Sequence, residues 1–194
     1  MTLENKKIGF CFTGSFCMFS KTIEALERLS IIKGIEITPI MSFNSYNLDT
    51  KFGKARDFIE KIESITKKKV IHTIVDAEPI GPKKMFDILI VAPCTGNTIS
   101  RLACDIIDTP VTMAVKSHLR NLRPVVIGIS TNNALSGNAE NIGRLLNRKH
   151  YYFVPVRQDN PITKPNSLVF DTSYIKWTLE EALDGKQIQP FLIM

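Results

Sequence analysis

The sequence lacks the features of membrane-spanning and zinc-binding proteins. No apolar run reaches the roughly 20 residues that a transmembrane helix needs. No apolar segment of signal-peptide length precedes a cleavage-like site near the first residue. The four cysteines form no CxxC pair, and none of the three histidines stands at zinc-ligand spacing from them. We therefore expect a protein of the reducing cytoplasm, with no metal and no membrane association.

The chain also lacks a strong excess of one charge. Lysine and arginine number 25 against 19 acidic residues, which gives a net charge of +6, and the basic residues are scattered. This modest excess suits anionic ligands, and without a patterned basic face it argues against nucleic acid as a partner. With 44% hydrophobic residues, the 194-residue chain is long enough for one domain with a sizeable core. We expect that domain to span residues 1–194.

Apolar runs typical of strands alternate with amphipathic segments of helical periodicity along most of the chain. This alternation predicts an α/β fold with three layers and one doubly wound, mostly parallel, Rossmann-like sheet. We expect residues 157–194 to form a C-terminal extension, in which a long connection over 157–170 precedes a final helix over 173–183. The expected strands span residues 7–12, 35–41, 70–75, 87–92, 124–129 and 151–156, and the expected helices begin near residues 16, 52, 95, 111 and 140.

The most informative segment is DILIVAPCTGNT, in which a buried strand ends at Pro93 and a small uncharged turn leads into a helix. Ligands of open α/β sheets bind at the carboxyl ends of the strands. We call residues 94–98 the second loop, because a first loop (residues 13–15) and a third loop (residues 130–133) also follow buried strands. All three offer neutral hydroxyl and amide groups, and together they predict a site for a phosphorylated heterocycle such as FMN.

The first loop differs from the common nucleotide-binding motifs. Ser15 stands where a P-loop has its lysine, and residues 41–44 contain no acid that would hold a ribose, so Walker-type and NAD-type sites are disfavoured. Gly14 and Ser15 at a helix N-terminus, with the Phe16 amide, are expected to bind the phosphate; a simple capping turn is the alternative. The other expected cofactor contacts are Ser42, Cys94, Thr95, Asn97, Thr98, Ser130, Thr131 and Asn132.

Over residues 6–156 the three loops resemble those of the flavoprotein family that includes the homo-oligomeric FMN-containing cysteine decarboxylases. Residues 13–15 match the glycine-serine phosphate turn of that family, residues 93–98 match its P-x-S-A-N-T turn, and residues 129–132 loosely match P-x-M-N. Two departures argue against cysteine decarboxylation. Pro79 occupies the place of the family's catalytic histidine, and Thr131 that of its methionine. The resemblance implies FMN, and homo-oligomers whose interfaces complete the flavin site.

Several longer segments, including EPIGPKKMFD and PVRQDNPITKPNSLVFD, are similar to one branch of this family, the B subunits of dipicolinate synthase. This implies a part in the oxidation of dihydrodipicolinate to dipicolinate during sporulation. It also implies an A subunit as partner, with NADP on its nicotinamide-binding domain. Either a flavin or that nicotinamide would accept the hydride.

Basic residues near one another in the sequence indicate a place for this doubly anionic substrate. We expect Lys116, Arg120 and Arg123 to hold its carboxylates, and His118 to act as acid–base catalyst. Two other functions remain open. A prenyl-transferring FMN-binding relative would share the phosphate site. A non-catalytic scaffold or partner-stabilising subunit would use the apolar end, residues 191–194, as an interface.

Overall fold

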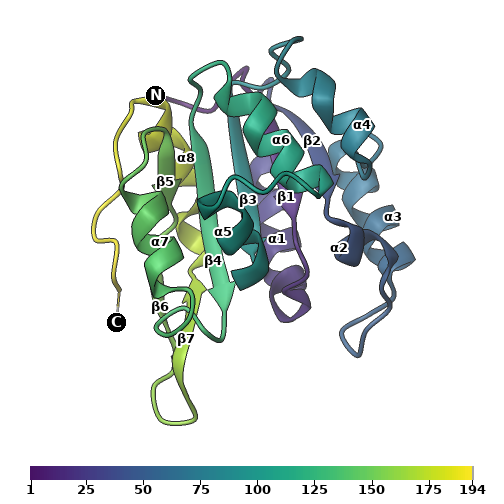
Figure 1. Cartoon of the computed structure of the whole chain (residues 1–194). Coiled ribbons are helices and arrows are strands. Elements are labelled where there is room, and N and C mark those ends of the chain that lie inside the picture. The colour runs from purple at the N-terminus through teal and green to yellow at the C-terminus, as the bar shows by residue number, and fades with distance from the viewer. Residues whose placement is uncertain (194) are drawn as a thin grey trace.

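The computed structural model describes residues 1–193, and a mostly parallel sheet forms its centre (Figure 1). The sheet order is β2-β1-β3-β4-β7-β6, with β5 paired to the first half of β4. Strands β1 to β5 run parallel, whereas β7 is antiparallel to both β4 and β6. The strands are β1 Lys7–Phe12, β2 Glu36–Met41, β3 Ile88–Cys94, β4 Val125–Thr131, β5 Tyr151–Phe153, β6 Val156–Asn160 and β7 Lys164–Phe170.

Helices cover both faces of the sheet, so the predicted doubly wound α/β fold is confirmed. Helices α5, α6 and α7 cover the near face in Figure 1, and α1 and α8 cover the far face. Helices α2, α3 and α4 lie at the β2 side of the sheet. The helices are α1 Phe19–Ser30, α2 Phe43–Asn47, α3 Ala55–Thr66, α4 Ile74–Ala77, α5 Gly96–Ala103, α6 Pro110–Leu119, α7 Ala139–Leu146 and α8 Ile175–Leu183, with short 3-10 turns η1 Phe16–Met18, η2 Glu78–Ile80 and η3 Thr172–Tyr174.

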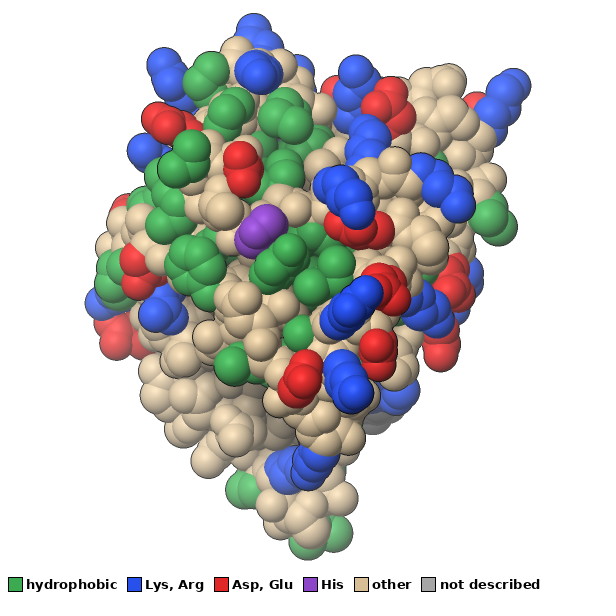
Figure 2. Space-filling model, turned by 90° about the vertical axis from the view of Figure 1, so that its right-hand side faces the viewer, with side chains coloured by type: hydrophobic (Ala, Val, Ile, Leu, Met, Phe, Trp, Pro, Cys, Tyr) green, Lys and Arg blue, Asp and Glu red, His purple; other side chains and the backbone are tan. Residues whose placement is uncertain are grey.

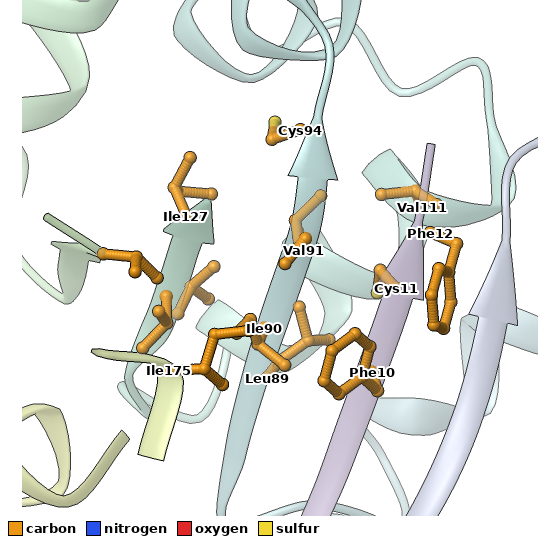
Figure 3. Close-up of a cluster of buried hydrophobic side chains, with 14 of the residues drawn as sticks. Phe10, Cys11, Phe12, Leu89, Ile90, Val91, Cys94, Val111, Ile127 and Ile175 are labelled. Atoms are coloured by element: carbon orange, nitrogen blue, oxygen red, sulfur yellow. The ribbon is translucent and has the colours of Figure 1, made fainter. Parts of the chain in front are cut away.

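The core lies on both faces of the central strands (Figure 3). Every residue of β3 is buried, as expected for a strand covered by helices on both sides. Phe10 and Phe12 of β1 stack with their ring centroids 5.0 Å apart. Gly9 makes room for a third ring, because a Cβ there would lie 2.6 Å from the Phe86 side chain. The same central strands carry the first and second loops at their carboxyl ends.

Two local predictions on the β2 side were wrong. Residues 70–75 form no strand; only Ile71 pairs, in a single bridge with Ile40. The Thr73 hydroxyl instead accepts a hydrogen bond from the Asp76 amide and starts α4, so a helix cap overrides the β-branched run. No helix was expected between the strand that ends at residue 41 and the helix that begins near residue 52, but Ser42 caps the short helix α2 there in the same way.

The predicted long connection over residues 157–170 was also wrong, because these residues form most of the β6–β7 hairpin. The Asn160 side-chain oxygen accepts hydrogen bonds from the amides of Ile162 and Thr163, at 3.0 and 2.8 Å, and this closes the turn. Strand β7 joins β4 only through the pairs Ser130–Val169 and Thr131–Leu168. The rest of the hairpin therefore extends beyond the body of the protein, next to the third loop (Figure 1).

The segment that precedes the chain end packs against the body of the protein. The Phe191 ring meets Phe153 edge-on at 5.9 Å, and Leu192 forms a bridge with Val156 at the start of β6. Leu192 remains 69% exposed. Met194, the last residue of the predicted apolar interface, lies outside the described residues.

The surface has no broad field of one charge on the face shown in Figure 2. Blue lysine and arginine side chains alternate there with red aspartate and glutamate side chains, and hydrophobic side chains gather beside them. Within residues 1–193, none of the helices combines the length and apolarity that a bilayer crossing requires. The same part of the chain contains no cluster of His, Cys, Asp and Glu that could hold a metal ion.

Candidate functional site

The first and second loops are joined by hydrogen bonds at the carboxyl ends of β1 and β3. The Thr13 hydroxyl donates to the Pro93 carbonyl oxygen at 2.7 Å and accepts from the Thr95 amide at 2.9 Å. Thr13 is buried, so these bonds form away from bulk water, where they hold their partners firmly. The end of β2 joins the same edge, because the Ser42 amide donates to the Phe12 carbonyl oxygen at 3.0 Å.

The third loop meets both of the others. The hydroxyl oxygens of Ser15 and Ser130 lie 2.7 Å apart, within hydrogen-bonding distance. Gly96, the first residue of α5, packs so closely against the third loop that a Cβ would lie 2.7 Å from the side-chain oxygens of Thr131 and Asn133. The three uncharged loops thus converge on one edge of the sheet, as the sequence predicts.

A buried asparagine anchors the third loop to α5. The Asn138 amide nitrogen Nδ2 donates to Asn133 Oδ1 at 2.9 Å, and Asn138 Oδ1 accepts from the Ser100 hydroxyl at 2.7 Å. Asn141 donates to the same two groups, Ser100 Oγ and Asn138 Oδ1, each at 3.1 Å. We did not predict these positioning residues. In the sequence they are marked only by the high number of asparagines over residues 132–141, which does not show that they bond to the third loop and to α5.

Two adjoining cavities lie against the converged loops. The larger, of about 680 Å³, lies among the first, second and third loops and the β6–β7 hairpin. The smaller, of about 380 Å³, lies among the first and second loops and the start of α2. Both volumes suit small-molecule sites. Gly14, Thr95 and Asn97 line both cavities. Of the other predicted cofactor contacts, Ser15, Phe16, Ser130, Thr131 and Asn132 line the larger, and Ser42 and Thr98 the smaller.

Cys94 is the predicted cofactor contact that lines neither cavity. Its side chain is fully buried, and burial raises the pKa of its thiol well above the ordinary value. Cys94 is the last residue of β3, and Figure 3 shows its side chain at the upper end of the core cluster. The second loop presents Thr95 and Asn97 to the cavities instead.

The donor set of the cavities is mostly neutral. The first amides of η1 and α5 have no partner within their own helices, which makes them available to an anion. Thr95 caps α5, since its hydroxyl accepts from the Thr98 amide at 3.3 Å. Amides and hydroxyls of this kind can hold a phosphate group and the polar edge of a planar ring.

Charged side chains also line both cavities, and the sequence patterns did not predict them. Arg101 and Asp108 form an ion pair at the smaller cavity, with Arg101 Nε 2.8 and 3.1 Å from the two carboxylate oxygens. At the larger cavity, Lys164 Nζ lies 2.5 Å from Asp159 Oδ2, and Lys51 approaches from the loop between α2 and α3. These residues come from segments far apart in the sequence.

The structure places the predicted substrate and acid–base residues at the opposite, amino edge of the sheet. Lys116 and Arg120 are exposed near the end of α6, and Arg123 donates to the Phe86 carbonyl oxygen at the start of β3. His118 is 1% exposed, and its Nε2 lies 3.1 Å from the carbonyl oxygen of Pro124, which precedes β4. The prediction failed because α6 runs away from the loops, so its last turn lies at the wrong edge.

Because His118 is buried, we expect the unfolding free energy of the protein to fall at acidic pH. Burial, opposed by the Pro124 hydrogen bond, lowers the pKa of His118 to about 4, against about 6.5 in an unfolded chain. Between these values the unfolded chain binds more protons, so stability is complete above about pH 6.5 and is lost as the pH falls toward 4. From pH 7.5 to 5, we expect His118 to lower the unfolding free energy by about 2 kcal/mol.

Denaturant unfolding of the natural protein and of His118→Gln at both pH values measures this contribution. The variant keeps an amide donor for Pro124 but has no group that titrates in this range. We expect its loss of stability between the two pH values to be smaller by about 2 kcal/mol. Equal losses in the two proteins would show that His118 is not the group responsible.

The chain that forms these three loops matches a known protein family. The sequence model of the family described as Flavoprotein matches residues 1–172, which include all three loops and the hairpin. The chain belongs to the Flavoprotein family. Within this flavoprotein, the matched region contains every residue that lines the two cavities.

Two relatives match this flavoprotein over nearly its whole length. The B subunit of dipicolinate synthase from Bacillus subtilis (strain 168) is 43% identical over 192 residues, which cover 99% of this chain and 96% of the relative. The crystal structure of the corresponding B subunit from Bacillus halodurans C has 44% identity and a TM-score of 0.91, over 100% of this chain and 99% of that one. The predicted resemblance to this branch is confirmed.

A more distant solved structure shares the fold of this flavoprotein. DmrB of Burkholderia xenovorans, described as a cubic protein cage for redox transfer and solved in complex with FMN, has a TM-score of 0.67 at 18% identity. The match covers 93% of this chain and 96% of that one. At this identity the likeness establishes the shared architecture.

Proposed function

We propose that this chain is the B subunit of a dipicolinate synthase and takes part in oxidising dihydrodipicolinate to dipicolinate during sporulation. The observation that carries the proposal is the convergence of three uncharged loops on adjoining cavities, in a chain 43% identical to such a subunit over 99% of its length. The reaction removes two hydrogens from a dihydropyridine ring and therefore needs a hydride acceptor.

The loops fit an FMN-type cofactor. Gly14, Ser15 and the Phe16 amide offer neutral donors for the phosphate, and Ser130 reinforces them through its 2.7 Å contact with Ser15. Thr95, Asn97, Thr98, Thr131, Asn132 and Ser42 offer the hydroxyls and amides that would surround the ring and the sugar chain. When bound, FMN would supply the hydride acceptor.

The chain itself would contribute the fixed positions of these donors. The Thr13 and Asn138 hydrogen bonds fix the loops relative to one another, which holds the donors in place before any ligand arrives. The two carboxylates at the cavities, Asp108 and Asp159, are each paired with a cation. The pairing offsets these two charges, and the three loops themselves contain no charged side chain.

An A subunit with NADP is the proposed partner, and a homo-oligomer that completes the flavin site is the proposed assembly. The alternative hydride acceptor is the partner's nicotinamide, with this chain holding the substrate. A purely scaffolding subunit is the alternative function. The packed segment around Phe191 weakens the scaffold hypothesis, because its ring contacts Phe153 of the same chain.

Reconstitution with FMN tests the proposal. We expect the purified chain to retain FMN through gel filtration and to show flavin absorbance, and dihydrodipicolinate to bleach that absorbance without oxygen. Reduction of NADP only when the A subunit is present, with the flavin still oxidised, would assign the hydride to the partner. A chain that takes up no FMN and leaves the A subunit's rate unchanged would disprove the catalytic role.

A further inference from the structure

The larger cavity reaches beyond the three loops to a short turn that presents a cation and an aromatic ring. Lys51 and Phe52 form the tip of this turn, which is closed by reciprocal backbone hydrogen bonds between Thr50 and Gly53, at 3.0 and 3.1 Å. Phe52 is 48% exposed, and Lys51 Nζ lies 5.3 Å from the centroid of its ring. Lys51 forms no ion pair with any residue of the described part, 1–193.

A second cation reaches the same cavity from the other end of the sheet. Lys164 begins β7, whereas Lys51 follows β2, and these strands lie on opposite sides of the central pair β1 and β3. Figure 1 shows both segments extending past the carboxyl edge of the sheet. Asp159 holds Lys164 at 2.5 Å, and both side chains are substantially exposed, so this pair exchanges readily with water or an incoming anion.

We propose that Lys51 and Lys164 each bind one carboxylate of the substrate, while Phe52 packs on the face of its ring. This inference rests on the proposed function, which makes the product a planar aromatic ring with carboxylates on both sides of its nitrogen and the substrate the dihydro form of that ring. Two cations from opposite walls match such a dianion, and an exposed aromatic ring at a cavity wall matches its face. The two lysines take the place of the basic residues that the sequence indicated, which lie at the amino edge.

The phosphate of FMN has the same anionic chemistry as a carboxylate and is the competing ligand for these cations. The first loop already offers neutral donors to a phosphate. Within residues 1–193, Lys51 and Lys164 are the only lysine or arginine side chains that line the larger cavity, so the carboxylates of the substrate have no other cation there. We therefore assign the lysines to the substrate. An experiment must measure the binding of each anion separately.

Titration calorimetry of the full chain with pyridine-2,6-dicarboxylate and with pyridine-2-carboxylate tests the assignment. We expect the natural protein to prefer the diacid by at least about tenfold, because the second carboxylate gains a charge-assisted hydrogen bond. Lys51→Met and Lys164→Met should each weaken diacid binding by at least about tenfold and abolish the preference. Phe52→Leu should weaken both acids by a similar factor, since it removes the ring contact alone.

Lys33→Met is the matched control, because Lys33 is also exposed but lies before β2, at the amino edge. It should bind both acids as the natural protein does, and FMN retention should be unchanged in all four variants. Diacid binding that is unchanged in both Lys51→Met and Lys164→Met would overturn this inference and leave the proposed function intact. Loss of FMN with diacid binding retained would assign the lysines to the phosphate. A natural protein that binds neither acid would overturn the proposed substrate itself.

Discussion

Replacement of Gly96 by alanine is expected to separate the second loop from the third and to weaken FMN binding by at least about tenfold. The added Cβ would lie 2.6 to 2.7 Å from the side chains of Thr131, Asn133 and Asn138. The Thr131 hydroxyl and the Asn138 amide both donate hydrogen bonds to Asn133 Oδ1. Moving any one of these side chains alone would break a hydrogen bond. We therefore also expect the unfolding free energy to fall by about 1–3 kcal/mol.

Gly143→Ala provides the matched control for this substitution. Gly143 is exposed within α7, and a Cβ there would meet nothing within 4 Å. Alanine at such a helix position should raise stability, by up to about 1 kcal/mol, and leave FMN binding unchanged. Denaturant unfolding and FMN titration of both variants measure the two effects. If Gly96→Ala binds FMN as well as Gly143→Ala does, the loop junction does not shape the cofactor site.

Replacement of Asn97 by aspartate is expected to abolish FMN retention while the fold becomes slightly more stable. Asn97 is exposed, lines both cavities and is the second residue of α5. A carboxylate in the first turn of a helix interacts favourably with the helix dipole, by about 0.3–1 kcal/mol. The same charge would repel an anionic cofactor and place a full charge against its ring, which we expect to cost at least about 100-fold in affinity.

The opposite signs of the two effects make this variant informative. Thermal unfolding should show a stability equal to or above that of the natural protein, and gel filtration should yield a colourless chain. Asn97→Ser is the neutral control, since it removes the amide without adding a charge and should retain part of the flavin. Unchanged flavin content in Asn97→Asp would place the cofactor elsewhere.

The sequence was sufficient where one segment carries its own signal. The buried run before Pro93 and the small polar turn after it indicated a strand, a loop and a helix, and β3 and α5 lie there. Alternation of such units indicated a parallel sheet, and parallel strands bring their carboxyl ends to one edge. The prediction that the first, second and third loops meet therefore followed from local patterns alone.

Prediction failed where a side-chain cap competed with residue preference. The Thr73 cap starts α4 within a β-branched run that predicted a strand, and the Asn160 side chain closes a hairpin where a long connection was expected. Each outcome depends on one side chain that accepts hydrogen bonds from backbone amides. The average helix or strand propensity of a segment does not predict such a hydrogen bond.

The sequence by itself determined the mostly parallel α/β sheet and the uncharged character of the loops at the ends of its central strands, because these depend on residues adjacent in the chain. Only the tertiary structure decided which charged residues accompany the loops. In the structure, His118 and its basic neighbours lie at the amino edge. Lys51 and Lys164, which come from opposite ends of the sheet, line the same cavity. The direction of a helix and the reach of a hairpin are set by packing against distant elements, and spacing along the chain does not encode them.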